Sequence, residues 1–192
     1  MHTTWVNSHR KRVLSRLKQC ARSAELLEGR IMHAHIIIND DDDGAGDGLC
    51  VDVGMATSII DMYGKCGSLQ EAHCIFDRMQ VRTVVSWGAM MSGYVEHGQS
   101  YKALELFNRL YLESFIPDNL LFSFVLVACI KIGALAQGKQ VHCMLLTSRI
   151  GLDVVVGNIL IDLYVKWGTH GDAYRVFHGL RFRSVVTWSA MI

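Results

Sequence analysis

Apolar side chains recur at steps of three and four residues along most of the chain, the spacing of one face of an α-helix. In residues 84–118 the first such stripe comprises Val84, Trp87, Met90, Met91 and Tyr94. Residues 97–99 (His-Gly-Gln) interrupt it, and glycine suits the left-handed residue that ends many helices. A second apolar stripe follows over residues 103–110. The segment therefore predicts a helix, a glycine turn and a second helix.

The same layout returns along the chain with a long period. Residues 51–91 come back as residues 152–192, and 15 of the 41 aligned pairs are identical. The spacing of 101 residues divides into successive repeats of 31, 35 and 35 residues. One helix pair cannot bury its own apolar face, whereas stacked pairs share a continuous core. We therefore predict an all-α fold, an α-solenoid of stacked helix-turn-helix repeats.

The repeat register also sets the predicted boundaries. A tail over residues 1–9 precedes a first repeat at 10–52, which carries an insertion at 40–48. Complete repeats follow at 53–83, 84–118, 119–153 and 154–184, and residues 185–192 open a further one. Because the sequence stops inside that repeat, we expect a truncated array whose open apolar end associates with itself.

Composition agrees with a packed helical protein and excludes a membrane-spanning one. Hydrophobic residues make up 51% of the chain, and a single proline interrupts it. No run of 18 apolar residues occurs, so neither a membrane span nor a membrane partner is expected. The formal net charge of +1 gives no overall attraction for a polyanion.

The first 24 residues are basic, with six Lys or Arg residues and no acid. Such a stretch is typical of an organelle transit segment. From Arg10 onward, however, it aligns with the repeat that begins at Asn119, and Cys20 then matches Cys129. The alignment favours a helix of the first repeat, so no clear transit peptide is expected.

Three features invite a metal or disulfide interpretation. The insertion at 40–48 is rich in Asp and Gly but lacks the final glutamate of a calcium loop, which favours a flexible acidic loop. His33 and His35 form an HxH pair, yet His33 matches His142 in the repeat, which favours packing. The six cysteines have no paired short spacing and are expected to be reduced. We predict no metal and no cofactor.

Several long motifs resemble plant pentatricopeptide-repeat proteins. They are IDMYGKCGS at 60–68, VVSWGAMMSGY at 84–94, ALELF at 103–107 and GKQVH at 138–142. The repeat lengths are similar to the subclass that mixes ordinary, long and short motifs. In that scheme 53–83 and 154–184 are short, 84–118 is ordinary, 10–52 and 119–153 are long, and 185–192 is a partial ordinary repeat. The resemblance covers residues 10–192.

This resemblance implies binding of single-stranded RNA in mitochondria or chloroplasts, at about one base per repeat. It assigns base reading to the fifth and the last residue of each repeat. Those residues are Thr57 with Thr83, Gly88 with Asp118, Ser123 with Asp153, Asn158 with Ser184, and Ser189 in the partial repeat. Apolar residues at the second position would sandwich the base; they are Val85, Val155 and Val186.

The pairs differ in how well they fit the family's pattern. Asn158 with Ser184 is similar to a pyrimidine-reading pair that favours cytosine, and Ser123 with Asp153 to a guanine-reading pair. Gly88 offers no side-chain hydrogen bond, and the Thr57 with Thr83 pair departs from the usual ending in Asp or Asn. Helix capping is an alternative role for Asp118 and Asn158. For Lys65 and Lys166, phosphate contact and simple solvation stay equally open.

No catalytic signature occurs in the chain. It has no glycine-rich phosphate loop, no GxSxG motif and no HxE…PCxxC motif of zinc deaminases. The resemblance therefore implies a recognition module without catalysis, which acts in organelle RNA processing such as C-to-U editing together with editing-complex proteins. Four complete repeats and a modified first one would read about 4–5 bases. The alternative function is a helical-repeat scaffold for protein partners.

Overall fold

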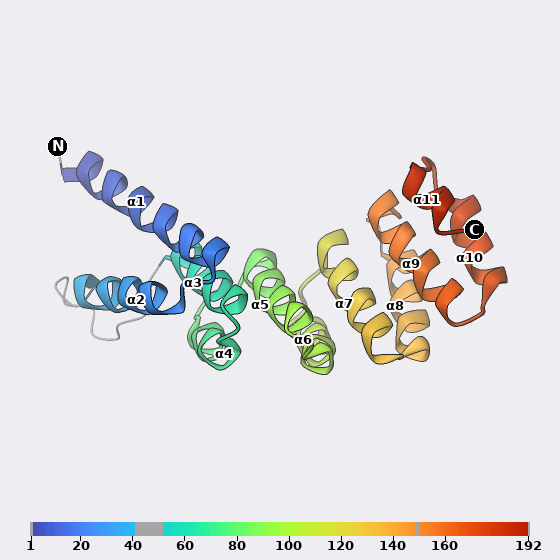
Figure 1. Ribbon diagram of the computed structural model, residues 1–192, viewed down its shortest axis with the longest axis horizontal. Helices are drawn as coiled ribbons and strands as arrows, with labels where there is room; N and C mark the ends of the chain where they lie inside the picture. Colours follow the sequence, from blue (N-terminus) through green and yellow to red (C-terminus); the bar gives the residue numbers. More distant parts are fainter. Residues whose placement is uncertain (1, 41–51, 149, 192) are drawn as a thin grey trace. The chain divides into compact units, whose positions relative to one another are not determined.

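The computed structural model describes residues 2–40, 52–148 and 150–191. All regular secondary structure in those ranges is α-helical, so the predicted all-α solenoid class is confirmed (Figure 1). The helices are α1 (His2–Ser23), α2 (Leu26–Asp40), α3 (Val53–Lys65), α4 (Leu69–Arg78), α5 (Val84–Glu96), α6 (Ser100–Leu112), α7 (Asn119–Ile132), α8 (Leu135–Thr147), α9 (Val154–Lys166), α10 (His170–Gly179) and α11 (Val185–Ser189).

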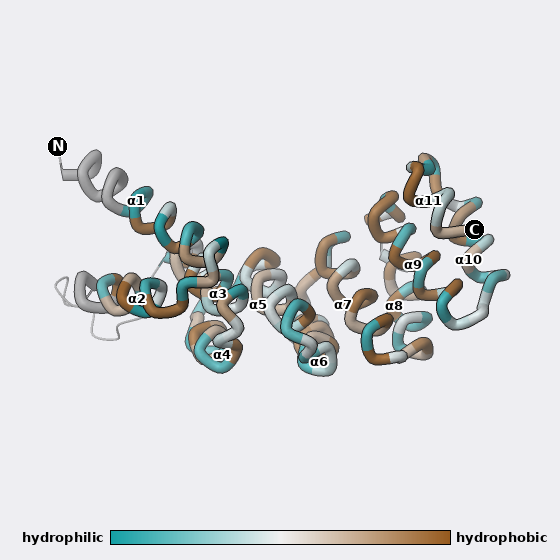
Figure 2. Tube along the Cα trace, in the orientation of Figure 1, coloured by the Kyte–Doolittle hydropathy of each residue, from teal (hydrophilic) through white to brown (hydrophobic). Residues whose placement is uncertain are grey.

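The chain divides into two compact bodies, an N-terminal body (Met1–His97) and a C-terminal body (Gly98–Ile192). In the N-terminal body, α3 packs between α1 and α5, while α2 and α4 each pack against the helices on either side of them in the sequence. In the C-terminal body, α9 packs against α7, α8, α10 and α11, and α6 packs against α7. Hydrophobic residues run along α7 and α9 (Figure 2). In each body the first helices of successive repeats are direct neighbours.

The first helix of each later repeat begins where the apolar pattern resumes, at Val53, Val84, Asn119, Val154 and Val185. Four of these helices are capped by the side chain of the preceding residue, which is the last residue of the previous repeat. The caps are Thr83, Asp118, Asp153 and Ser184. A side-chain oxygen at this position satisfies a backbone N–H that has no partner inside the helix. Local capping therefore fixes where these four helices begin.

Two expectations need correction or limitation. Residues 1–9 were expected to form a tail, but α1 already begins at His2. No Gly or Pro interrupts residues 2–23, so the helix of the first repeat continues toward the N-terminus. Of the acidic insertion expected at 40–48, only Asp40 is described, as the last residue of α2, and the rest lies outside the described residues.

The cysteines among the described residues occupy three kinds of environment. Cys20 and Cys129 are buried in first helices, and burial raises the pKa of the Cys129 thiol to about 11. Such thiols act as small apolar side chains. Cys74 and Cys143 are exposed on second helices. Cys66, at the end of α3, is half-buried, and burial raises the pKa of its thiol.

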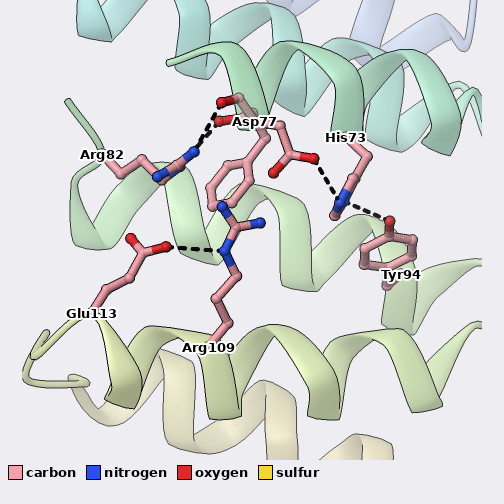
Figure 3. A network of polar contacts seen from close by, with 7 residues as sticks. His73, Asp77, Arg82, Tyr94, Arg109 and Glu113 are labelled. Carbon is pink, nitrogen blue, oxygen red and sulfur yellow. Dashed lines mark hydrogen bonds and ion pairs between the residues drawn. The ribbon is translucent and has the colours of Figure 1, made fainter. Parts of the chain in front are cut away.

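A histidine–tyrosine contact recurs between neighbouring repeats. A ring nitrogen of the histidine on a second helix lies 2.8–3.0 Å from the hydroxyl of the tyrosine on the next first helix. The pairs are His33 with Tyr63, His73 with Tyr94, and His142 with Tyr164. Figure 3 shows the second pair, in which the other ring nitrogen of His73 faces Asp77 at 3.2 Å. The packing role expected for His33 is thus observed, and the described residues contain no group of metal ligands around it.

Because of two of these histidines, we expect the stability of the fold to fall at acidic pH. Burial lowers the pKa of His33 and of His142, and Asp172 only partly opposes this at His142. The unfolded chain then binds protons that the folded chain does not, so the free energy of unfolding falls as the pH drops below about 6.5. Urea denaturation at about pH 7.5 and about pH 5.5 measures this loss. A His33→Gln/His142→Gln double variant is expected to lose less stability over that range; an unchanged loss would contradict the assignment.

Two glycines face each other where α3 and α5 pack together in the N-terminal body. A Cβ atom on Gly93 of α5 would lie 3.0 Å from the Cα of Gly64 on α3 and 3.3 Å from Leu69 Cδ2. The nearest of these atoms belongs to backbone, which cannot rotate away. Small residues at this crossing therefore allow α3 and α5 to pack closely.

A Gly93→Ala substitution is expected to lower the free energy of unfolding by about 1–3 kcal/mol, the usual cost of overpacking. Urea denaturation measures the change. Gly171→Ala is the matched control, because a Cβ at that helical glycine meets nothing within 4 Å. The control is expected to be neutral or stabilising by up to about 1 kcal/mol. Equal effects at the two positions would rule out the close crossing as the cause.

Candidate nucleic-acid interface

The second residue of several repeats is an exposed apolar side chain near the start of the first helix. In the N-terminal body this residue is Val85, 69% exposed. In the C-terminal body Val155 and Val186 are 61% and 62% exposed on the neighbouring helices α9 and α11. A single exposed apolar residue is common on protein surfaces. Its recurrence at the same position of several repeats indicates that these positions bind a ligand.

Sequence reasoning missed one member of this set. Leu120 is the second residue of the 119–153 repeat and is 56% exposed on α7, which packs against α9. Leu120, Val155 and Val186 therefore follow one another on three successive first helices of the C-terminal body. The signal was present in the register, because Leu120 precedes Ser123 by the same three residues that separate Val155 from Asn158.

The fifth positions lie deeper than the second positions in the complete repeats, whereas Ser189 of the partial repeat is exposed and donates its hydroxyl to the Val185 carbonyl oxygen at 3.0 Å. Thr57 and Ser123 are nearly buried, and Gly88 is buried within α5. The Thr57 hydroxyl donates to the Val53 carbonyl oxygen at 2.7 Å, and the Ser123 hydroxyl donates to that of Asn119 at 2.8 Å. Bonds of this kind to the previous helical turn occupy the hydroxyl proton and leave only the oxygen lone pairs for a ligand.

The last positions are all helix caps. The Leu121 amide donates to Asp118 Oδ1 at 2.9 Å, and the Val156 amide donates to Asp153 Oδ1 at 2.8 Å. Thr83 and Ser184 accept from the third residue of the following helix at 3.3 Å. Capping, raised above for Asp118, is therefore observed at all four positions. It leaves each aspartate a second carboxylate oxygen for another partner.

Among the predicted reading pairs, hydrogen bonds link only Asn158 to Ser184, and they do so through the side chain of Thr187. Asn158 Oδ1 accepts from the hydroxyl of Thr187 at 2.7 Å, and the same hydroxyl oxygen accepts from the Ser184 amide at 3.0 Å. Thr187 is fully buried and Asn158 is half-buried. Asn158 and Ser184 thus lie on either side of one threonine that the motif-based interpretation did not single out. No such bond joins Thr57 to Thr83 or Ser123 to Asp153, and Gly88 and Asp118 lie in different bodies.

Lys65 and Lys166, the two candidates for a phosphate contact, have different surroundings. Lys65 Nζ lies 2.8 Å from Asp61 Oδ2 on the same helix. Lys166 is exposed at the end of α9. An ion pair one helical turn apart holds the Lys65 charge near α3, whereas Lys166 presents its charge to solvent. Lys166 is therefore the better placed of the two for a phosphate.

These features define a helical-repeat protein whose first helices present exposed apolar residues beside recessed polar ones. The family model described as PPR repeat matches residues 55–84, 85–113 and 158–185. A chloroplastic pentatricopeptide repeat-containing protein of Arabidopsis thaliana is 32% identical over 170 residues, covering 88% of this chain and 20% of the relative. A mitochondrial one from the same plant is 32% identical over 180 residues, covering 93% and 22%.

Among solved structures, maize PPR10 in complex with an 18-nt psaJ RNA element aligns with a TM-score of 0.62 at 18% sequence identity. The alignment covers 98% of this chain and 33% of that one. The chain belongs to the pentatricopeptide-repeat family. It spans about a fifth of the length of the curated relatives. None of the described helices is long and apolar enough to cross a membrane.

Proposed function

We propose that this chain binds single-stranded RNA in a plant organelle and serves there as a recognition module without catalysis of its own. The observation that carries the proposal is the ordered set Leu120, Val155 and Val186 on α7, α9 and α11. An apolar side chain contacts the face of an unpaired base through dispersion, and it does so for every base. Polar groups at the fifth and last positions would then meet the base edge.

The 154–184 repeat has the most complete set of candidate base-binding residues. A base between Val155 and Val186 would have its Watson–Crick edge toward Asn158, which lies one helical turn beyond Val155. Since Thr187 donates to Asn158 Oδ1, the amide nitrogen and its two hydrogens point away from that bond. Donor hydrogens suit the N3 and O2 acceptors of cytosine, whereas uracil presents an N3–H donor. The geometry supports the expected preference for cytosine.

The finer assignments rest on the relatives. Several carry chloroplastic or mitochondrial in their names, and PPR10 was crystallised with RNA. We propose a mitochondrial or chloroplast location, membership of the subclass with ordinary, long and short motifs, and a role in RNA processing such as C-to-U editing. Catalysis would come from editing-complex proteins that this chain recruits or from parts of a longer product.

A protein-interaction scaffold is the second candidate. Val185 and Trp188 expose apolar surface on α11, at 82% and 58%. Such a patch suits a protein partner or a second copy of the chain. Light scattering of the purified chain measures self-association: dimers that a Trp188→Ala variant lacks would support it, and a monomer at high concentration would oppose it.

Fluorescence anisotropy with a labelled random-sequence RNA of about 12 nucleotides tests the proposed function. We expect saturable binding to the single strand, weaker binding to a duplex of the same length, and affinity that falls with added salt. A charge-matched protein of unrelated fold is the control. Absence of binding above that control, together with a stable protein partner in a pull-down, would favour the scaffold instead.

A further inference from the structure

Thr187 is the third residue of α11 and takes part in the cap of that helix. Its amide donates to Ser184 Oγ at 3.3 Å, and the Ser184 amide donates to Thr187 Oγ1 at 3.0 Å. This reciprocal pair satisfies two N–H groups at the helix start. The Ser184 and Thr187 hydroxyl oxygens also lie 3.1 Å apart. With Ser184 as the donor of that bond, the Thr187 hydroxyl keeps its own proton for another acceptor.

That proton has an acceptor in the preceding repeat. The Thr187 hydroxyl donates to Asn158 Oδ1 at 2.7 Å, across 29 residues of sequence and from α11 to α9. Thr187 is fully buried, so water cannot easily replace the contact. Because the Asn158 Oδ1 atom can only accept, the Thr187 hydroxyl is the donor of this bond. The carbonyl end of the Asn158 amide is thereby held inward and the NH₂ end outward.

The equivalent residue in the N-terminal body shows that this contact is not a general consequence of the cap. Ser86 is also the third residue of its helix, is also fully buried, and forms the same reciprocal pair with Thr83. Its hydroxyl donates to the Thr83 carbonyl oxygen at 2.8 Å. The fifth residue of the preceding repeat, Thr57, donates instead to the Val53 carbonyl oxygen. Ser86 therefore caps its helix without orienting a reading residue.

We propose that Thr187 is a positioning residue that fixes the Asn158 amide with its NH₂ group toward the RNA base and so makes the repeat prefer cytosine over uracil. The inference rests on the proposed RNA-binding function and adds a residue to it. A freely rotating amide could present either its NH₂ group to cytosine N3 or its oxygen to uracil N3–H. The Thr187 bond selects the first orientation. The third residue of the following repeat thereby takes part in reading the base.

The experiment compares Thr187→Val, which removes the hydroxyl at nearly constant volume, with Thr187→Ser, which keeps it. Ser86→Ala is the matched control, since it removes the same kind of capping bond without a contact to a reading residue. The probes are single-stranded RNAs from a pool enriched on the unmodified chain, with cytosine or uracil at the position that Asn158→Ala makes unselective. Thermal unfolding checks that each variant is folded.

We expect the cytosine-to-uracil affinity ratio to fall from about tenfold to about one in Thr187→Val, while Thr187→Ser and Ser86→Ala retain it. An equal ratio in Thr187→Val and the unmodified chain would overturn the inference and leave RNA binding standing. Loss of the ratio in Ser86→Ala as well would also overturn it, because the effect would then come from capping. Failure of the unmodified chain to bind any single-stranded RNA would instead overturn the proposed function and this inference with it.

The orientation itself has a readout without RNA. In nuclear magnetic resonance spectra, the side-chain NH₂ signals of Asn158 are expected to shift in Thr187→Val and to stay in place in Thr187→Ser. Unshifted Asn158 signals in Thr187→Val would show that the hydroxyl does not hold the amide, and would overturn the inference independently of any binding assay.

Discussion

An Asn158→Ala variant is expected to lose base selection at one position of its RNA while preferences at other positions stay as they are. Asn158 supplies the only side-chain amide among the proposed reading residues, and its Oδ1 atom is already held by Thr187. Removing the amide removes the donors that distinguish cytosine. A good base contact contributes about 1–3 kcal/mol, so discrimination at that position should fall by about 5- to 100-fold.

Enrichment of a random RNA pool on the two proteins, followed by sequencing, measures the effect. Asp162→Ala is a suitable control, because Asp162 is an exposed residue of the same helix that no proposed contact uses. The control should select the same RNAs as the unmodified chain. A uniform loss at all positions in Asn158→Ala would indicate misfolding, and unchanged selection would contradict a reading role for Asn158.

Trp87→Ala is expected to destabilise the protein far more than Trp188→Ala, although the two tryptophans hold the same place in the repeat. Both rings meet a phenylalanine edge-on, Trp87 with Phe76 at 4.7 Å and Trp188 with Phe177 at 4.8 Å. Trp87 is fully buried, whereas Trp188 is 58% exposed. Truncation of a fully buried aromatic residue costs about 3–5 kcal/mol, while Trp188→Ala should cost about 1 kcal/mol from the ring contact.

Equilibrium urea denaturation followed by circular dichroism gives both values. The phenylalanine ring beside each tryptophan also contacts an arginine. The Cζ atom of Arg82 lies 5.0 Å from the centre of the Phe76 ring, and that of Arg183 lies 4.8 Å from the centre of the Phe177 ring. Each arginine also donates to backbone carbonyl oxygens at the end of the preceding helix. Figure 3 shows Arg82 directed at those carbonyl oxygens. The local surroundings are thus matched, and the difference in burial is the main variable. Equal losses of stability would show that burial of the ring is not what decides the cost.

The fold could be predicted from the sequence because its determinants are local. The apolar stripe that begins at Val84 follows one helix face, and Thr83 just before it has a side chain that can cap the helix. The same combination recurs at Asp118, Asp153 and Ser184. The cap directly precedes the stripe and the turn follows it, so a short stretch of sequence locates each helix.

The candidate site was less predictable because its determinants lie between repeats. The link from Thr187 to Asn158 depends on how α11 packs against α9, and no spacing rule within one repeat reveals it. The exposure of Trp188 likewise differs from that of Trp87 although the motif is the same. Leu120, by contrast, could be predicted from the register alone, because it is the second residue of its repeat.

Mapping the RNA on the protein tests the central claim most directly. Single-stranded RNA that contains 4-thiouridine is bound to the chain and crosslinked with ultraviolet light, and the modified peptides are identified by mass spectrometry. We predict crosslinks in the first helices, at or next to Val85, Leu120, Val155 and Val186. Crosslinks confined to the second helices α4, α6, α8 and α10 would contradict the proposed interface.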